Sequence, residues 1–261
     1  MQTVVRTGGR PDDNARQRAF FASNTLNIPF VERQKRSMKK LMEQERANVL
    51  VAGKHRYEYY AYGQREPFFF HPSSAAFRAK RMARGEIDTF VDVAKLQLGD
   101  SMLDCTLGMA TDSMLAAIKV GAAGRVVGCE GNEVIAFMMT QGLKEYDYIE
   151  EKLPQLEVMR RIEVVPSIAV DYLKTLPAES FDVVYMDPMF EETIEASTNF
   201  APLREAGVHI GLDDEWMAEA LRVAKKRVVL KAHYRSPLFE RYAFQRVPRP
   251  NIKFHYGVIE K

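Results

Sequence analysis

Asp187 follows an apolar run and precedes a proline, in the order Val-Val-Tyr-Met-Asp-Pro-Met-Phe from residue 183. The run is typical of a buried strand, and Pro188 cannot donate a backbone hydrogen bond, so we expect the strand to end at Asp187. A carboxylate there can accept hydrogen bonds from an amine, and the ring of Phe190 can stack on a flat ring. An ordinary strand followed by a proline turn would show the same pattern. The residues upstream must therefore distinguish a functional acid from a purely structural strand end.

Two further acids occupy similar places. Asp104 and Glu130 each fall at the end of an apolar run, 26 positions apart. Gly108 follows Asp104 and allows a backbone to pass close to a ligand, and Asp112 is expected at the N-terminus of the next helix. An acid in the position of Glu130 can hold both hydroxyls of a ribose.

The elements that must position these acids alternate between strand and helix. Strands are expected at residues 102–106, 125–129, 162–165, 183–187 and 227–231, and a closing hairpin at 242–247 and 251–259. Five such steps with short loops predict an α/β fold with a doubly wound parallel sheet. Ligands bind such sheets at the carboxyl ends of the strands, where the three acids fall.

Residues 1–85 are predicted to form a small α+β domain ahead of the larger domain of residues 86–261. Residues 1–84 hold 17 Lys and Arg against 7 Asp and Glu, a balance of +10, and residues 85–261 hold 20 against 28, a balance of −8. The two sum to the net charge of +2. This asymmetry predicts that the N-terminal part contacts nucleic acid, although a solvated basic helix face would also explain it.

Composition narrows the class of protein. The chain has 261 residues, 46% of them hydrophobic, and no apolar run reaches the roughly 20 residues of a membrane span. The N-terminus shows no secretory signal, and Cys105 and Cys129 are expected in strands as core residues of a reducing compartment. The five histidines are scattered. We therefore expect a cytoplasmic protein without a membrane span or a metal site.

The acids fit a nucleoside cofactor that has no pyrophosphate. A phosphate cradle would require G-x-G-x-x-G or a P-loop lysine, and the sequence has neither. Asp104 would also repel a pyrophosphate. S-adenosyl-L-methionine, whose amino and sulfonium groups are cationic, is favoured over NAD.

With these motifs, the chain resembles the class I methyltransferases, and most closely the ribosomal RNA small subunit methyltransferase J family. The matching residues are Phe69-Phe70-His71-Pro72-Ser73, Leu103 to Asp112, Glu130, Gly142-Leu143, Asp187-Pro188-Met189-Phe190 and Val228 to Lys231. The resemblance covers most of residues 66–261. It implies a Rossmann-like sheet, mostly parallel with a C-terminal antiparallel hairpin.

The resemblance also implies roles for individual residues. Thr111 and Asp112 would border the methionine part of the cofactor, Glu130 and Gly131 the ribose, and Ser167, Ile168 and Ala169 the adenine. Asp187 would face both the cofactor and the target amine. The family methylates the exocyclic N2 of a guanine in small-subunit rRNA, so the implied partner is that RNA or the assembled subunit.

Four positions depart from the family pattern. Ala110 stands where the family usually has a second glycine, Glu191 where it usually has proline, and Ile168-Ala169 where it has paired hydroxyls. The prediction of the cofactor is therefore firmer than that of the substrate. One alternative is a methyltransferase of the same fold that acts on another RNA, a protein or a small molecule. An alternative of another class is a non-catalytic RNA-binding protein with a vestigial cofactor site. The sequence does not indicate an oligomeric state.

Overall fold

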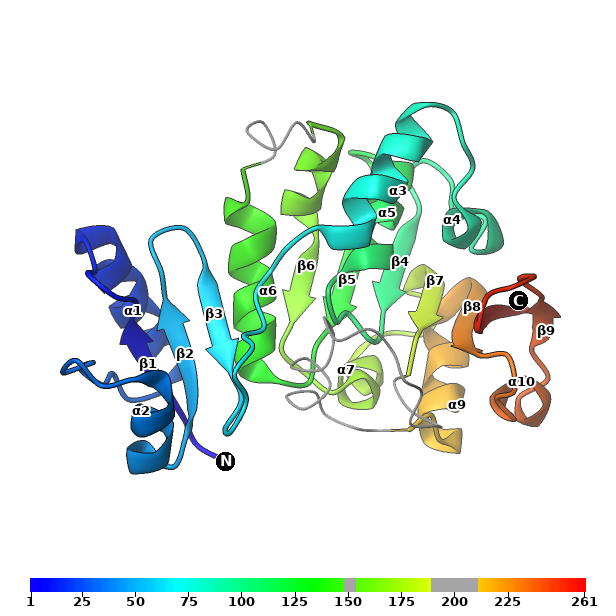
Figure 1. The fold of residues 1–261 in the computed structure, drawn as a ribbon. Coiled ribbons are helices and arrows are strands. Elements are labelled where there is room, and N and C mark those ends of the chain that lie inside the picture. The colour runs from blue at the N-terminus through cyan, green and yellow to red at the C-terminus, as the bar shows by residue number, and fades with distance from the viewer. Residues whose placement is uncertain (148–153, 189–210) are drawn as a thin grey trace.

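A computed structural model of the protein describes residues 1–147, 154–188 and 211–261. A small three-stranded sheet lies beside a larger seven-stranded sheet (Figure 1). The predicted Phe190 and the departure at Glu191 lie outside the described residues.

The small sheet has the order β1 (Thr3–Thr7), β2 (Asn48–Ala52) and β3 (Tyr57–Tyr60). Strands β2 and β3 form an antiparallel hairpin, and β1 runs parallel to β2. A parallel pair needs a crossover, which contains α1 (Asp13–Leu26) and α2 (Met38–Glu45). Asp12 begins α1 by accepting a hydrogen bond from the Ala15 N–H.

The large sheet has the order β6-β5-β4-β7-β8-β10-β9. Its strands are β4 (Ser101–Asp104), β5 (Arg125–Cys129), β6 (Glu163–Val165), β7 (Phe181–Met186), β8 (Ala224–His233), β9 (Gln245–Val247) and β10 (Phe254–Glu260). The first five in this order are parallel, and β10 lies antiparallel between β8 and β9. The predicted fold class, with its closing antiparallel hairpin, is confirmed.

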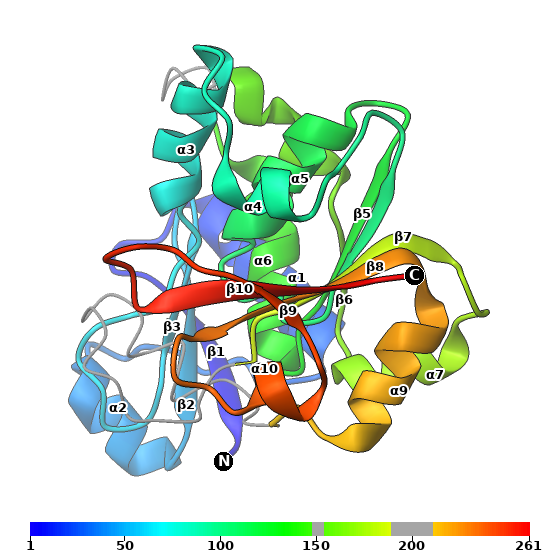
Figure 2. The ribbon, with the colours of Figure 1, turned by 90° about the vertical axis from the view of Figure 1, so that its right-hand side faces the viewer.

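Helices cover both faces of this sheet (Figure 2). One face carries α3 (Ser73–Ala83), α4 (Thr89–Val93), α5 (Thr111–Val120), α6 (Glu133–Glu145) and the 3₁₀ helix η1 (Pro154–Arg161). The other carries α7 (Ala169–Thr175), α9 (Asp214–Val223) and α10 (Leu238–Arg241). Neighbouring strand residues alternate between the two cores, as Met102 and Leu103 do. The strands are apolar on both faces because both faces are buried.

The strand order reverses between β4 and β7. The chain moves from β4 through β5 to β6 in one direction, then crosses back to place β7 on the other side of β4. Such a switch point is where open α/β sheets bind ligands. Asp104 ends β4 and Asp187 follows β7, so the topology brings these two acids to the same edge of the sheet.

The two parts of the chain pack against each other through aromatic rings. Phe137 of α6 lies 5.1 Å from the ring of Tyr57 and 5.8 Å from that of Phe21. A Cβ at Gly142 would lie 2.2 Å from the Phe70 ring, so this helix position requires glycine. Helix α3 also packs against α5. The division at residue 85 therefore runs through continuous packing and stays a proposal.

One local prediction was wrong. Cys105 lies in the turn after β4 rather than in a strand, although it is buried and free as expected. Helix α4 is short and spans only Thr89–Val93. Asp88 begins it by accepting hydrogen bonds from the Phe90 and Val91 N–H groups, and the positive φ of Lys95, 44°, prevents its continuation.

Candidate active site

Charged side chains from four elements meet at the carboxyl edge of the large sheet. Asp112 lies in the first turn of α5, Asp187 follows β7, and Lys231 lies on β8. The Lys231 Nζ is 2.6 Å from Asp187 Oδ2 and 3.4 Å from Asp112 Oδ2. Asp104, at the end of β4, is close enough for its pKa to feel both acids. The structure thus brings Asp104, Asp112 and Asp187 close together at this edge.

Asp104 is buried at the centre of this edge. Its Oδ2 accepts a hydrogen bond of 2.6 Å from the Ser113 hydroxyl, and its Oδ1 accepts one of 3.0 Å from the Thr106 N–H. Burial raises the pKa of Asp104 to about 7, and the neighbouring carboxylates of Asp112 and Asp187 add to the rise. The loop after β4 also positions Asp187, because the Asp187 N–H donates to the Thr106 hydroxyl at 2.8 Å.

Asp112 is the centre of a buried ion network. Arg78 of α3 donates to its Oδ1 at 2.7 Å, and the Tyr185 hydroxyl donates to its Oδ2 at 2.7 Å. Arg78 also forms a two-pronged pair with Asp88, both contacts at 2.8 Å. Burial opposes the charge of Asp112, yet Lys231 and Arg78 lower its pKa to about 2. Asp112 therefore stays ionised and ties α3, α5 and β8 to one another.

Asp187 keeps one carboxylate oxygen available. Its Oδ2 is held by Lys231, whereas Oδ1 accepts no hydrogen bond from the residues that the structure describes. Its side chain is 31% exposed. Burial raises the pKa of Asp187 and Lys231 opposes that rise. Burial likewise opposes the charge of Lys231, but Asp187 and Asp112 hold the pKa of its ammonium above the ordinary value. The result is an oriented carboxylate whose Oδ1 accepts no hydrogen bond from residues 1–147, 154–188 or 211–261.

The neighbouring loops carry the other predicted residues. Gly108 has a φ of 49° in the turn after β4, and Ala110 has a φ of 55° immediately before Thr111. The left-handed conformation costs a residue with a Cβ about 1 kcal/mol, which explains why glycine would suit position 110. The sequence departure at Ala110 therefore places a residue with a Cβ in a strained, left-handed backbone conformation.

Glu130 and Gly131 follow β5, and Ser167 and Ile168 follow β6, so all four lie at the same edge. The Glu130 Oε1 accepts a hydrogen bond of 2.9 Å from the Asn132 N–H, and burial raises the pKa of this carboxyl. Ser167 and Ile168 are half-buried ahead of α7. These partly accessible groups have the chemistry to contact a nucleoside, because a carboxylate can accept hydrogen bonds from ribose hydroxyls and an apolar side chain can pack on a base.

Sequence reasoning missed two members of the network. Arg78 looked like one cation of a basic helix, and Tyr185 like an ordinary residue of a buried strand. Tyr256 of β10 pairs in register with Lys231 and was also unassigned. For Lys231 a signal existed: it follows an apolar run, as Asp187 does.

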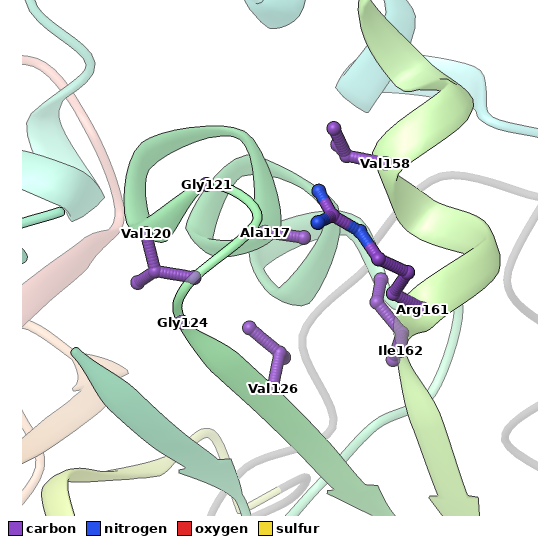
Figure 3. Close-up of a pocket in the computed structure, with 8 residues that line it drawn as sticks. All are labelled: Ala117, Val120, Gly121, Gly124, Val126, Val158, Arg161 and Ile162. Atoms are coloured by element: carbon purple, nitrogen blue, oxygen red, sulfur yellow. The ribbon is translucent and has the colours of Figure 1, made fainter. Parts of the chain in front are cut away.

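Figure 3 shows a pocket away from this edge. It lies between α5 and η1 at the amino end of β5, and its volume of about 10 Å³ suits a water molecule at most. Its lining residues are Ala117, Val120, Gly121, Gly124, Val126, Val158, Arg161 and Ile162. It is too small for the cofactor and lies at the wrong end of the sheet.

Over the described ranges, no cluster of His, Cys, Asp and Glu side chains has the geometry to bind a metal ion. Within the same ranges, no helix has the length and apolar character needed to cross a membrane.

Replacing Asp104 with Asn is expected to flatten the pH dependence of stability. An acid whose pKa is raised to about 7 on folding contributes stability at low pH, and that contribution is lost as pH rises from about 4 through 7. The wild type should lose about 3 kcal/mol between pH 5 and pH 8 through this group. Urea unfolding of both proteins at the two pH values measures the difference. Equal pH dependence in the two proteins would show that Asp104 is not the group responsible.

The strand order, with acids at the carboxyl ends of β4, β5 and β7, defines a class I methyltransferase. The chain matches the family model described as "Putative SAM-dependent methyltransferase" over residues 35–247. It therefore belongs to this family of S-adenosylmethionine-dependent methyltransferases, which confirms the predicted cofactor.

The sequence of the chain is similar to two groups of known proteins. The chain is 40% identical over 257 residues to the uncharacterized protein YpiP of Bacillus subtilis, across 98% of this chain and 99% of that protein. It is 30% identical over 176 residues to the ribosomal RNA small subunit methyltransferase J of Proteus mirabilis, across 66% and 68%. The match to the protein of the same name from Nitrosococcus oceani, at 30% identity, spans half of each chain.

Among solved structures, a SAM-dependent methyltransferase from Neisseria gonorrhoeae superposes with a TM-score of 0.58. The alignment covers 98% of this chain and 95% of that one, at 15% identity. This likeness concerns the fold.

Proposed function

We propose that the protein methylates the exocyclic N2 of a guanine in small-subunit rRNA. The observation that carries the proposal is the Asp187 carboxylate, directly before Pro188, which Lys231 orients through Oδ2 and whose Oδ1 bonds to no residue in the described ranges. An exocyclic amine is a weak nucleophile because its lone pair is delocalised into the ring. An acceptor fixed at the edge of the sheet can hold such an amine in the orientation that transfer requires.

The chain's own residues would act by placement. Asp187 Oδ1 accepts a hydrogen bond from the amine and Lys231 prevents the carboxylate from turning away. The target base must leave its stack to reach the site, and Phe190 is proposed to stack on it. S-adenosylmethionine supplies an activated methyl group on a sulfonium.

The cofactor is proposed to lie along the edge formed by the loops after β4, β5 and β6. Its contacts would be Asp104, Gly108, Thr111, Asp112, Glu130, Gly131, Ser167, Ile168 and Asp187. Because Asp112 is already bonded to Arg78, Tyr185 and Lys231, we assign it to holding the site together beside the methionine group.

An RNA substrate is supported by the charge distribution and by the name of the methyltransferase J relatives. Some of the basic residues of the N-terminal part are neutralised within the protein: Arg78 points to Asp88 and Asp112, and Arg81 pairs with Glu86. Lys35 and Lys40 are exposed and form no ion pair with the residues that the structure describes, so they remain available for a polyanion. A ribosomal substrate would place the protein in the cytoplasm.

The test is methyl transfer from labelled S-adenosylmethionine to small ribosomal subunits isolated from a strain lacking the protein. Nuclease digestion then maps the label. Label on a guanine N2 of the small-subunit RNA is the expected result. Label on another RNA, on a protein or on a small molecule would overturn the substrate and keep the reaction. Cofactor binding without label in any acceptor would favour a non-catalytic RNA-binding module.

A further inference from the structure

A group of aromatic and basic side chains lies just beyond Lys231 and has no part in the network described above. It comprises His233, Tyr234 and Arg235 at the end of β8, with Phe254 and His255 at the start of β10. We call these five residues the C-terminal platform. His233 pairs in register with Phe254, and the Tyr234 N–H donates to the Lys253 carbonyl at 2.8 Å, so the two strand ends are fixed to each other.

The rings of the platform form a connected series. The His233 ring centroid lies 4.6 Å from that of Tyr234 and 6.2 Å from that of Phe254. The Tyr234 ring lies 5.9 Å from that of His255, and the Arg235 guanidinium lies 5.1 Å from the Tyr234 centroid. Tyr234 is nevertheless 36% exposed and Arg235 is exposed. An exposed tyrosine carrying an arginine offers a flat, cationic surface to solvent.

The position of the platform relates it to the proposed chemistry. His233 is two residues beyond Lys231 along β8, about 7 Å at the rise of a strand. Lys231 in turn contacts Asp187. Because β8 runs parallel to β7, the end of β8 lies at the same edge of the sheet as Asp187. The platform therefore begins about one nucleotide length away from the proposed position of the target base.

The charge of this segment differs from that of its domain. Residues 233–256 contain Arg235, Arg241, Arg246, Arg249 and Lys253 against one acid, Glu240, a balance of +4. Residues 85–261 as a whole, including this segment, carry −8. Arg241 is paired with Asp214 at 2.8 Å, whereas Arg235, Arg249 and Lys253 form no ion pair in the part of the chain that the structure describes. These three cations remain available for an anion.

We propose that the C-terminal platform binds single-stranded RNA beside the target nucleotide, with a neighbouring base stacked on Tyr234 and its phosphates near Arg235 and Lys253. The proposal rests on the proposed function, and it names the surface that receives the substrate. A base removed from its stack leaves its neighbours without a partner, and aromatic rings interleaved with cations replace that stacking without reading sequence.

The test is the binding of full-length protein, with S-adenosylmethionine, to a fluorescein-labelled single-stranded RNA of mixed sequence, followed by anisotropy. Tyr234→Ala and Arg235→Ala should each raise the Kd for this RNA about tenfold, while Tyr234→Phe, which keeps the ring, should stay within about twofold of wild type. The Kd for S-adenosylmethionine should not change.

Arg125→Ala is the matched control. Arg125 also lies over an aromatic ring, 5.4 Å from the centroid of Phe181, but it sits at the amino end of β5 and is paired with Glu163. Its removal should leave RNA binding unchanged. If Arg125→Ala weakened RNA binding as much as Arg235→Ala does, the effect would reflect general charge attraction. That result would overturn the proposal that the platform binds RNA.

The KM for RNA in the methyl-transfer assay separates this inference from the proposed function. A wild type that methylates no RNA overturns the proposed function. A wild type that methylates RNA, with a Tyr234→Ala variant of unchanged KM, overturns the platform alone. A raised KM with unchanged kcat in Tyr234→Ala supports it.

Discussion

Replacing Asp187 with Ala is expected to lower the rate of methyl transfer about 10³-fold, equivalent to about 4 kcal/mol of transition-state stabilisation. The reason is that Asp187 Oδ1 is the acceptor proposed to hold the target amine. Folding should survive, because Lys231 still faces Asp112 at 3.4 Å and its charge stays compensated. Single-turnover methyl transfer to RNA measures the rate, and calorimetry measures binding of S-adenosylmethionine, which should be partly retained.

Two further variants test this prediction, one with an intermediate expected effect and one as a control. Asp187→Asn keeps an oxygen acceptor but loses the ion pair with Lys231, so its rate should fall between those of the wild type and the alanine variant. Asp171→Ala removes an exposed acid of α7 and should leave the rate unchanged. If Asp187→Ala transferred methyl groups at near wild-type rate, the assignment of Asp187 would be wrong.

Replacing Asp112 with Ala is expected to destabilise the protein by about 3–5 kcal/mol. The change removes the carboxylate that Arg78 and Lys231 share, and it leaves the buried Tyr185 hydroxyl without its acceptor. The destabilisation is limited to this range because Arg78 still pairs with Asp88 and Lys231 still pairs with Asp187. Denaturant unfolding at pH 7 measures the change in the free energy of unfolding.

Glu43→Ala is the control for this prediction. Glu43 pairs with Lys39 on α2 at 3.9 Å, with both side chains exposed, and such surface pairs contribute about 0.5 kcal/mol or less. The pH dependence gives a second check. The pKa of Asp112 is lowered to about 2 on folding, so its contribution is present above pH 4 and is lost as pH falls toward 2. If Asp112→Ala lowered the free energy of unfolding by less than about 1 kcal/mol, the stabilising role assigned to the buried network would be wrong.

The sequence by itself determined the large sheet and the edge at which the acids lie. Apolar runs that end on Asp104, Glu130 and Asp187 mark strand ends through local periodicity, and parallel strands must bring those ends to one edge. The helices α1, α2 and α9 begin at the side-chain caps Asp12, Ser37 and Asp213, which are local features of the sequence.

Only the tertiary structure decided which groups are bonded to one another at that edge. Arg78 meets Asp112 across 34 positions of sequence, and Lys231 meets Asp187 across 44. No local pattern separates an arginine that points inward from one that faces solvent on the same helix. The placement of β10 between β8 and β9 is similar, because pairing partners are chosen by packing rather than by periodicity. That placement brings Phe254 and His255 beside Tyr234, so the aromatic surface next to the proposed active site exists only in the folded chain.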